Sequence, residues 1–401
     1  MNRFIVLLCL VGLFSCTKQA EPLDESSDST TGKSLENANK IAMAYTNTFN
    51  VYERNGYKIV DLKAPIVSWG GDAKGGEQAA RVVLVPREIE PPELTGDLAN
   101  AVLIRTPVER IAINYVFLEA IVTTLELTDK LVAVGGVKGY DDNIRALTLD
   151  GSLAQVGYGW HMPPMIDPLL NSNPDVFFMV MGSFEHTKQY ERIKKLGIPV
   201  VPIFFEAETS YMGSLDYVRL LGFFAGKETE ANTFVKMVSD NVLALKALVA
   251  DKPKKSVMNA WFAGSGRWMV SVRNAANALM EDAGGTNPFV QGDDVRMDEF
   301  VKMSSETLLE QARDIDCWII RDSHSQSFDN VDFLRNFNAW NTGCLFAADG
   351  KSKPEVDAFD IDATGKIRPD IILRDLVKML HPELISEPYI FVQPDTKTPR
   401  S

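Results

Sequence analysis

The strongest constraint on the fold of this chain is one long segment, residues 228–250, that contains neither glycine nor proline. Apolar residues recur through it at helical spacing, at Ala231, Phe234, Val235, Val238, Val242, Leu245, Leu248 and Val249. A helix of roughly 23 residues extends for about 34 Å, because each residue adds about 1.5 Å. Since Asp251-Lys252-Pro253 ends the pattern, we predict one rigid helix between two folded regions.

Short apolar runs of strand length occur on both sides of this segment. They lie at 110–114, 131–134, 176–181, 198–205, 256–262, 317–320 and 344–347. Most are uninterrupted by polar residues, which is typical of parallel strands covered on both faces. Helical stretches such as 187–196 and 275–283 separate several of them. The alternation predicts an α/β fold: two lobes with mainly parallel central sheets, joined by one long backbone helix.

The first lobe, 45–227, is expected to open with a β-hairpin. Phe49 and Val51 precede Asn55-Gly56, and Tyr57 and Ile59 follow it. Asn-Gly supplies the positive φ angles of a tight turn. Residues 81–86 are predicted to form a further strand. The second lobe is expected at 254–392, with a short tail at 393–401.

Residues 1–15 have the parts of an export signal: Arg3, an apolar core over 4–14, and the small residue Ser15. The apolar core is far shorter than the roughly 20 residues of a membrane-spanning helix. Leu13-Phe14-Ser15-Cys16 resembles the bacterial lipoprotein box, which implies cleavage before Cys16 and lipid on its sulfur. The alternative is ordinary secretion with an incidental thiol.

The segment 16–44 is expected to be a flexible tether, because much of it is too polar to bury a core. The protein is then exported and lipid-anchored to the bacterial cell membrane, facing the periplasm or the exterior.

Composition narrows the partners. With 401 residues, 45% of them hydrophobic, the chain suits two medium lobes. A net charge of −13 argues against nucleic acid as a partner and gives no basic face for anionic lipid. Of four cysteines, Cys9 leaves with the signal and Cys16 carries lipid. Cys317 and Cys344 remain, either as a disulfide or as two buried thiols.

Several weak motifs occur in a fixed order between residues 104 and 392. The first lobe holds Thr106-Pro107-Val108-Glu109-Arg110-Ile111, Asp167 with Asn173-Pro174-Asp175-Val176, Leu196-Gly197-Ile198-Pro199-Val200, and Gly226-Lys227-Glu228. The second holds Asp282-Ala283-Gly284-Gly285-Thr286-Asn287, Ser304-Ser305-Glu306, Asp316-Cys317-Trp318-Ile319, and Arg368-Pro369-Asp370 before Leu380-His381-Pro382. Together they resemble the substrate-binding proteins of ABC importers for iron chelates (siderophores and haem) and cobalamin.

The resemblance implies a monomer that captures a small-molecule metal chelate in a cleft between its lobes and delivers it to an ABC importer permease dimer. A helical connection between the lobes would permit only small closure. In this family one acidic residue on each lobe pairs with permease arginines. The matching positions are Asp167 and Glu306, with Glu310 as a rival to the second.

Ligands of open α/β sheets bind beyond the carboxyl ends of the strands, and domain interfaces favour small-molecule sites. We therefore expect the ligand-binding residues just after predicted strands. These are Tyr158, Trp160, His161, Glu185, His186, Arg267, Trp268, Arg321 and His324.

The chemistry of these residues leaves the ligand open. Arg267 and Arg321 suit the carboxylates or catecholates of an anionic chelate, and Tyr158, Trp160 and Trp268 offer flat apolar surfaces. The histidines either ligate metal directly or only hydrogen-bond polar ligand groups. We expect an iron chelate, either a siderophore or haem, with cobalamin or another corrinoid as the alternative and direct binding of a metal ion less favoured.

Two other classes compete with a binding protein. An enzyme is disfavoured, because the sequence lacks a Gly-x-Ser-x-Gly elbow, a phosphate-binding Gly-Lys-Ser/Thr loop and a His-Glu-x-x-His helix. We accordingly expect neither catalytic residues nor a resident cofactor. A purely structural surface lipoprotein is the third reading, and it predicts that no chelate binds.

Overall fold

The computed structural model describes residue 35 and residues 37–65, 77–159, 163–182, 184–290, 300–321, 328 and 330–398. All the elements below lie in one compact unit, Glu36–Ser401. The predicted signal and most of the predicted tether, including Cys16, lie outside the described residues. No helix in the described ranges is both long enough and apolar enough to span a bilayer.

The first lobe begins with a five-stranded sheet in the order β1-β2-β3-β4-β5. Its strands are β1 (Asn39–Ile41), β2 (Phe49–Arg54), β3 (Tyr57–Pro65), β4 (Glu77–Pro86) and β5 (Val102–Thr106). All neighbours are antiparallel except β4 and β5. The predicted hairpin is confirmed: Asn55 and Gly56 join β2 to β3 with φ angles of 51° and 83°.

A second sheet of the first lobe is parallel throughout, in the order β10-β9-β6-β7-β8. Its strands are β6 (Ile111–Ile113), β7 (Leu131–Val134), β8 (Ala154–Gln155), β9 (Val176–Val180) and β10 (Val200–Ile203). The helices between them are α1 (Val116–Thr124), α2 (Asp142–Leu149), α3 (Ile166–Ser172) and α4 (Phe184–Lys195). β9 and β10 are buried along their whole lengths, as expected for strands covered on both faces.

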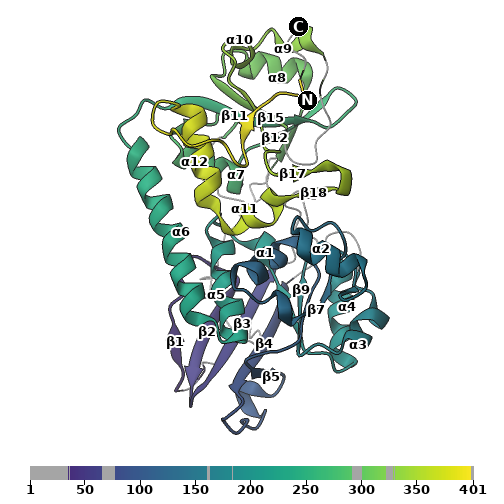
Figure 1. The fold of residues 1–401 in the computed structure, drawn as a ribbon. Coiled ribbons are helices and arrows are strands. Elements are labelled where there is room, and N and C mark those ends of the chain that lie inside the picture. Colours follow the sequence, from purple (N-terminus) through teal and green to yellow (C-terminus); the bar gives the residue numbers. More distant parts are fainter. Residues whose placement is uncertain are drawn as a thin grey trace, which may run out of the picture. The chain divides into compact units, whose positions relative to one another are not determined.

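The long helix α6 (Glu228–Val249) connects the lobes (Figure 1). It follows α5 (Gly213–Ala225), which ends where Gly226 takes a left-handed φ of 69°. α6 packs against α5 in the first lobe and against α12 (Pro369–Leu380) in the second. Ala231, Val235, Val238 and Val242 form its buried stripe, as the spacing predicts, whereas Leu248 is 42% exposed.

The second lobe has a mixed sheet in the order β14-β12-β11-β15-β16-β19, and β13 also pairs with β11. The strands are β11 (Lys255–Phe262), β12 (Arg267–Ser271), β13 (Gly285–Thr286), β14 (Phe300–Ser304), β15 (Cys317–Arg321), β16 (Leu345–Ala347) and β19 (Gln393–Pro394). β11, β15 and β16 run parallel, while β12, β14 and β19 are antiparallel to their neighbours. The antiparallel additions flank the parallel centre that the sequence predicts.

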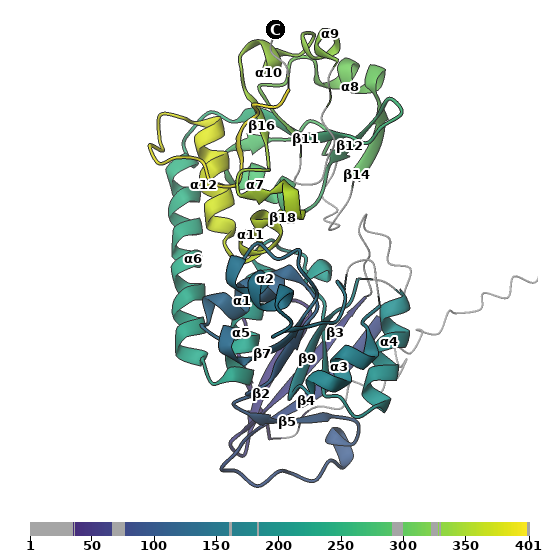
Figure 2. The same ribbon diagram turned by 45° about the vertical axis from the view of Figure 1, so that its right-hand side comes forward.

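Short elements complete this lobe (Figure 2). They are α7 (Ala275–Asp282), α8 (Ser305–Ala312), α9 (Val331–Leu334), α10 (Asn338–Asn341), α11 (Thr364–Ile367) and the small hairpin β17 (Ser352–Lys353) and β18 (Ala358–Phe359). α11 contacts both α1 and α5 of the first lobe. Two α/β lobes joined by one long helix confirm the predicted fold.

A disulfide resolves the two alternatives for the remaining cysteines. Cys317, at the start of β15, is bonded to Cys344, just before β16. It therefore covalently joins the beginnings of two adjacent parallel strands in the second lobe.

Candidate functional site

A pocket of about 290 Å³ draws its walls from both lobes. The first lobe contributes the 3₁₀ turn η3 (Phe205–Ala207), which follows β10, and the start of α5. The second contributes β11, β14, β15, α7, α12 and the region around α11. This interlobe pocket is lined mainly by Phe205, Glu206, Glu208, Tyr211, Asn259, Trp261, Phe300, Ile319, Ile361, Asp362, Lys366 and Ile372.

Aromatic rings from both lobes line the interlobe pocket. Trp261 and Phe300 meet edge to face, with ring centroids 5.0 Å apart. From the other lobe, Phe205 stacks on Tyr115 at 5.5 Å and on Phe117 at 4.6 Å. Such walls bind the apolar body of a ligand.

Strand alternation explains why β11 serves both the pocket and the core. Asn259 and Trp261 line the pocket, while Met258 and Ala260, which alternate with them, belong to the core of the second lobe. Successive side chains of a strand point to opposite faces, so one strand supplies both surfaces. Sequence reasoning missed Asn259 and Trp261, because it looked past the strand end.

The charged side chains that line the interlobe pocket in the described part of the chain are mostly acidic. Glu206 in η3 faces the pocket from the first lobe, and Asp362 and Lys366 line it from the second. Burial raises the pKa of the nearby Tyr115 hydroxyl, and the negative charges of Asp362 and Glu206 raise that pKa further. Asn259 adds a buried amide oxygen without a hydrogen-bond partner in the described part of the chain.

Glu208, also in the pocket wall, is held by the segment before β2. Its carboxylate accepts hydrogen bonds from the hydroxyls of Thr46 and Thr48 and from the backbone N–H of Asn47. Burial raises its pKa, and these hydrogen bonds oppose that rise. Gly213 is required here, because a Cβ at that position would lie 2.4 Å from Glu208 Oε2.

Several polar contacts bridge the lobes, among them an ion pair between Lys138 and Asp357. The Tyr211 hydroxyl donates to Asp282 of α7 at 2.6 Å. Elsewhere, Lys353 of β17 donates to the Tyr140 carbonyl at 2.9 Å and pairs with Asp142 at 2.7 Å. Its ammonium also lies 4.3 Å from the centre of the Tyr140 ring. These contacts tie the lobes together in addition to α6.

A buried carboxyl lies beneath the loop that follows β7. Glu119 of α1 is 2% exposed, and neither of its carboxyl oxygens has a hydrogen-bond partner in the described ranges. Burial raises its pKa to about 8, with a smaller contribution from Asp141. A Cβ on Gly139 would lie 2.0 Å from Glu119 Oε2, so the loop backbone covers the carboxyl closely. Glu119 is therefore mostly protonated at neutral pH.

Tyr158 is a predicted ligand residue that packs against the same loop. Its hydroxyl donates to the Gly136 carbonyl at 3.4 Å, and its ring leaves no room for a side chain at Gly135. It is half-buried but does not line the interlobe pocket.

Three other predicted ligand residues are buried within the protein and do not line the interlobe pocket. Trp268 is fully buried in the core of the second lobe, 5.2 Å from Trp318 between ring centroids. Its indole N–H donates to Ser305. Because 267–271 forms strand β12 rather than a loop, the alternation turns Trp268 inward.

Arg321 and His186 are engaged by the protein itself. The side chain of Arg321 is 6% exposed and forms ion pairs with Asp349 and Asp395, so its guanidinium is not available to an anionic ligand. His186 is 1% exposed, and its Nδ1 accepts a hydrogen bond from the backbone N–H of Gly182 at 2.9 Å.

The remaining predicted contacts stay predictions. Arg267 is exposed at the start of β12, opposite Ser304 of β14, and does not line the interlobe pocket. Glu185 lies in α4, but its side chain is outside the described part of the structure, as are Trp160, His161 and His324. Among the described residues, no group of three or more His, Cys, Asp or Glu is arranged to hold a metal ion.

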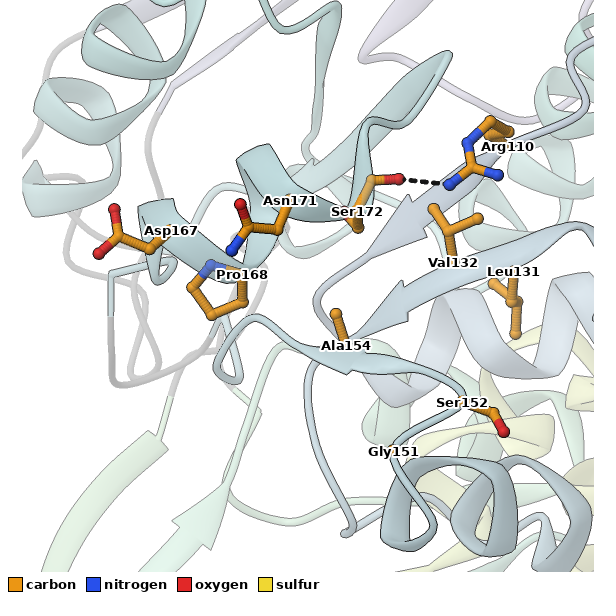
Figure 3. Close-up of a pocket in the computed structure, with 10 residues that line it drawn as sticks. All are labelled: Arg110, Leu131, Val132, Gly151, Ser152, Ala154, Asp167, Pro168, Asn171 and Ser172. Atoms are coloured by element: carbon orange, nitrogen blue, oxygen red, sulfur yellow. Dashed lines mark hydrogen bonds between the residues drawn. The ribbon is translucent and has the colours of Figure 1, made fainter.

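The predicted docking residues are both exposed. Asp167, in the first turn of α3, lines an open groove of about 610 Å³ with Arg110, Ser152 and Asn171 (Figure 3). Arg110 closes one end by donating to the Ser172 carbonyl at 2.7 Å, and the Asp167 carboxylate points away from it.

On the second lobe, Glu306 is exposed in the first turn of α8. A hydrogen bond from the Ser304 hydroxyl lowers the pKa of Glu306, so its carboxylate is negative at neutral pH. Its rival Glu310 is exposed in the same helix.

Comparison with known proteins identifies the family. The model of the periplasmic binding protein family matches residues 117–343. The chain belongs to this family. A curated relative, an uncharacterized lipoprotein of Methanocaldococcus jannaschii, is 27% identical over 271 residues, which are 64% of this chain. The match covers 62% of that lipoprotein, less than two thirds of its length.

Solved structures show the same fold. A periplasmic heme binding protein from Pseudomonas aeruginosa aligns with a TM-score of 0.53 and 15% identity, covering 73% of this chain and 99% of that one. An ABC transporter substrate-binding protein from Listeria monocytogenes aligns with a TM-score of 0.51 and 18% identity, covering 68% and 99%. At such identities the similarity establishes the fold alone, so the identity of the ligand has to be inferred from the site.

The buried carboxyl of Glu119 predicts a pH dependence of stability. Its folded pKa of about 8 exceeds the ordinary value of 4.5, so folding takes up a proton between these pH values. The free energy of unfolding should therefore fall as pH rises through this window, by at most about 1.4 kcal/mol per pH unit from this group. Glu119→Gln, which stays neutral, should remove that slope.

Denaturant unfolding of both proteins at pH 5, 6, 7 and 8 measures the effect. Glu109→Gln, at an exposed carboxylate of the same lobe, is the matched control and should keep the wild-type slope. Equal slopes for wild type and Glu119→Gln would show that the Glu119 carboxylate is solvated in the folded protein.

Proposed function

We propose that this protein is an extracytoplasmic solute-binding lipoprotein that captures an iron chelate, a siderophore or haem, and delivers it to an ABC importer. The observation that carries the proposal is the aromatic-walled pocket between two lobes of a periplasmic binding protein. Its position at the domain interface is where small molecules bind in such folds. The Pseudomonas and Listeria proteins of similar fold support the same class.

Within this class, cobalamin or another corrinoid is the alternative cargo. Direct capture of a metal ion is weaker, because such sites need a denser set of histidines and carboxylates than a chain with four histidines offers. Tyr158, Trp160, His161, Glu185, Arg267 and His324 are proposed as additional contacts around the cleft. A structural surface lipoprotein would bind none of these ligands.

Ligand titration tests the proposal. The detergent-solubilised full chain is titrated with haem, cobalamin and a panel of ferric siderophores while tryptophan fluorescence is recorded. At least one of these ligands should quench the tryptophan fluorescence saturably, because Trp261 lines the interlobe pocket. Trp261→Ala should weaken the binding of that ligand by about tenfold or more, because a loss of about 1.4 kcal/mol of binding free energy corresponds to tenfold in affinity.

Trp340→Phe is the control, because Trp340 packs against the core of the second lobe and does not line the pocket. It should retain wild-type affinity. No saturable quenching by any member of the panel would refute the proposed function.

Docking to the permease is proposed to use Asp167 and Glu306. Both are exposed, so replacing both with Ala should leave the fold intact. Ligand affinity should stay within about threefold, because neither residue lines the interlobe pocket. Uptake should fall sharply, since lost charge complementarity weakens docking and slows encounter.

Uptake of radiolabelled ligand by cells carrying the double variant measures this effect, with Glu310→Ala as the control on the same helix. Wild-type uptake by the double variant would exclude these positions. A defect in Glu310→Ala alone would move the second contact to Glu310.

The lipid anchor is proposed at Cys16. If lipid on its sulfur holds the protein at the membrane, Cys16→Ser should block lipoprotein processing and shift the protein to the soluble fraction. Immunoblots of fractionated cells measure the shift, with Cys9→Ser, which lies in the predicted signal, as the control. A Cys16→Ser protein that stays membrane-bound would contradict the anchor.

A further inference from the structure

We infer that Asn259 is a specificity-determining residue of the interlobe pocket, and that its side-chain amide binds a neutral carbonyl or amide group of the ligand. The inference deepens the proposed function and rests on it in taking this pocket as the ligand site. Within the proposed class it favours a ligand with amide-bearing arms, such as a siderophore with amide linkages or a corrinoid, over haem, whose polar side groups are carboxylates.

Asn259 interrupts an otherwise apolar face of β11. Side chains two residues apart on a strand share a face, so Val257, Asn259 and Trp261 lie on the same side of the sheet. Val257 is fully buried and Trp261 is 7% exposed. Ile319 of β15, which is paired with Asn259 in the parallel register, is also buried. A polar side chain at such a position costs stability, and sites that break a local rule in this way are often functional.

The Asn259 amide is not satisfied by the protein. Its Oδ1 is buried and has no hydrogen-bond partner in the described part of the chain. Of the buried side-chain atoms that lack a partner in the described ranges, this oxygen is the one that belongs to a lining residue of the interlobe pocket. By contrast, the amide of Asn277 in the same lobe donates to Glu281 at 2.8 Å and accepts from Asn287 at 2.9 Å. The contrast indicates that the Asn259 amide serves a group that enters the pocket.

The chemistry of an asparagine amide suits a group of its own kind. It carries an acceptor oxygen and a donor NH₂ group, and rotation by about 180° around its last torsion angle exchanges them. Either a carbonyl oxygen or an amide N–H of the ligand would then complete a hydrogen bond. Asn259 and its apolar neighbours Val257 and Ile319 carry no charge. A carboxylate placed against them would lose its hydration without gaining a counter-charge from these side chains.

The size and walls of the pocket suit an apolar arm. Its volume of about 290 Å³ is at the lower end of the roughly 300–1,000 Å³ that is typical of small-molecule sites. Leu279 and Met280 of α7 and Ile372 and Leu376 of α12 also line it. One arm of a larger chelate, apolar along its length and carrying a carbonyl or amide group, matches these walls and the unpaired amide of Asn259.

The stability of the ligand-free, detergent-solubilised full chain tests whether the amide is unsatisfied. Asn259→Leu replaces it with an apolar side chain of similar size, so the melting temperature should rise by about 1–3 °C. Asn277→Leu is the matched contrast and should lower the melting temperature, because it leaves Glu281 and Asn287 without their partner. Asn259→Ala, which adds no volume, controls for overpacking. A lower melting temperature in both Asn259 variants would overturn the inference.

Matched ligands test the recognition itself. A ferric trihydroxamate with a terminal acetamide is compared with the same complex carrying a terminal carboxylate, and cobalamin is compared with its derivative in which side-chain amides are hydrolysed to carboxylates. Wild-type protein should bind at least one amide form about tenfold tighter than its carboxylate counterpart. Asn259→Leu should reduce that preference to within about threefold, whereas Asn143→Leu, at an exposed position of α2, should keep it. Equal binding of both forms by the wild type, or an unchanged preference in Asn259→Leu, would contradict the role of Asn259.

Metal-free probes separate this inference from the proposed function. N-benzylacetamide, phenylpropanoate and butylbenzene share an aromatic body and differ in the polar group. They are titrated while tryptophan fluorescence is recorded, with Trp261→Phe to identify the signal. If no iron complex, haem or corrinoid binds, the proposed function fails and these probes decide the role of Asn259. It stands if N-benzylacetamide binds most tightly and Asn259→Leu weakens it about tenfold, and it is overturned if another probe binds as tightly or none binds.

Discussion

The burial of one stripe of α6 against both lobes is the interaction on which the rest of the structure depends. Val235 and Val238 are buried near the α5 end, and Val249 is buried near the second lobe. The backbone hydrogen bonds of a helix without a kink are continuous, so the helix has no single point at which it bends. One continuous helix thus packs on both lobes, whose residues together form the walls of the interlobe pocket.

Much of the fold could be predicted from the sequence, because its elements are marked by local signals. These signals are the continuous apolar runs, the Asn55-Gly56 turn and the helical periodicity over 228–249. Each reflects the conformation of neighbouring residues and does not depend on contacts distant in sequence. The antiparallel strand β12 is not among the predicted strands, because Gly264-Ser265-Gly266 interrupts the apolar pattern before it. These residues form a tight turn, and the strand resumes at Arg267.

The site was harder to predict than the fold, for a physical reason. Residues after strand ends look alike in sequence whether they face solvent, a ligand or a core. Trp268 packs against Trp318 in the core, and Arg321 pairs with Asp395, although both residue types are common in binding sites. Trp261 faces the interlobe pocket because of the face of β11 on which it lies. Which face meets the other lobe depends on long-range packing, which periodicity alone does not reveal.

The excess of acidic residues affects how the chain meets its partners. The net charge of −13 produces a negative field that attracts cations and raises their encounter rate with the protein. Glu119 does not add to this field, because burial keeps its carboxyl neutral. The exposed carboxylates of Asp167 and Glu306 suit a basic docking partner. Opposite charge on the two surfaces would speed their encounter, which is the step that precedes delivery in the proposed function.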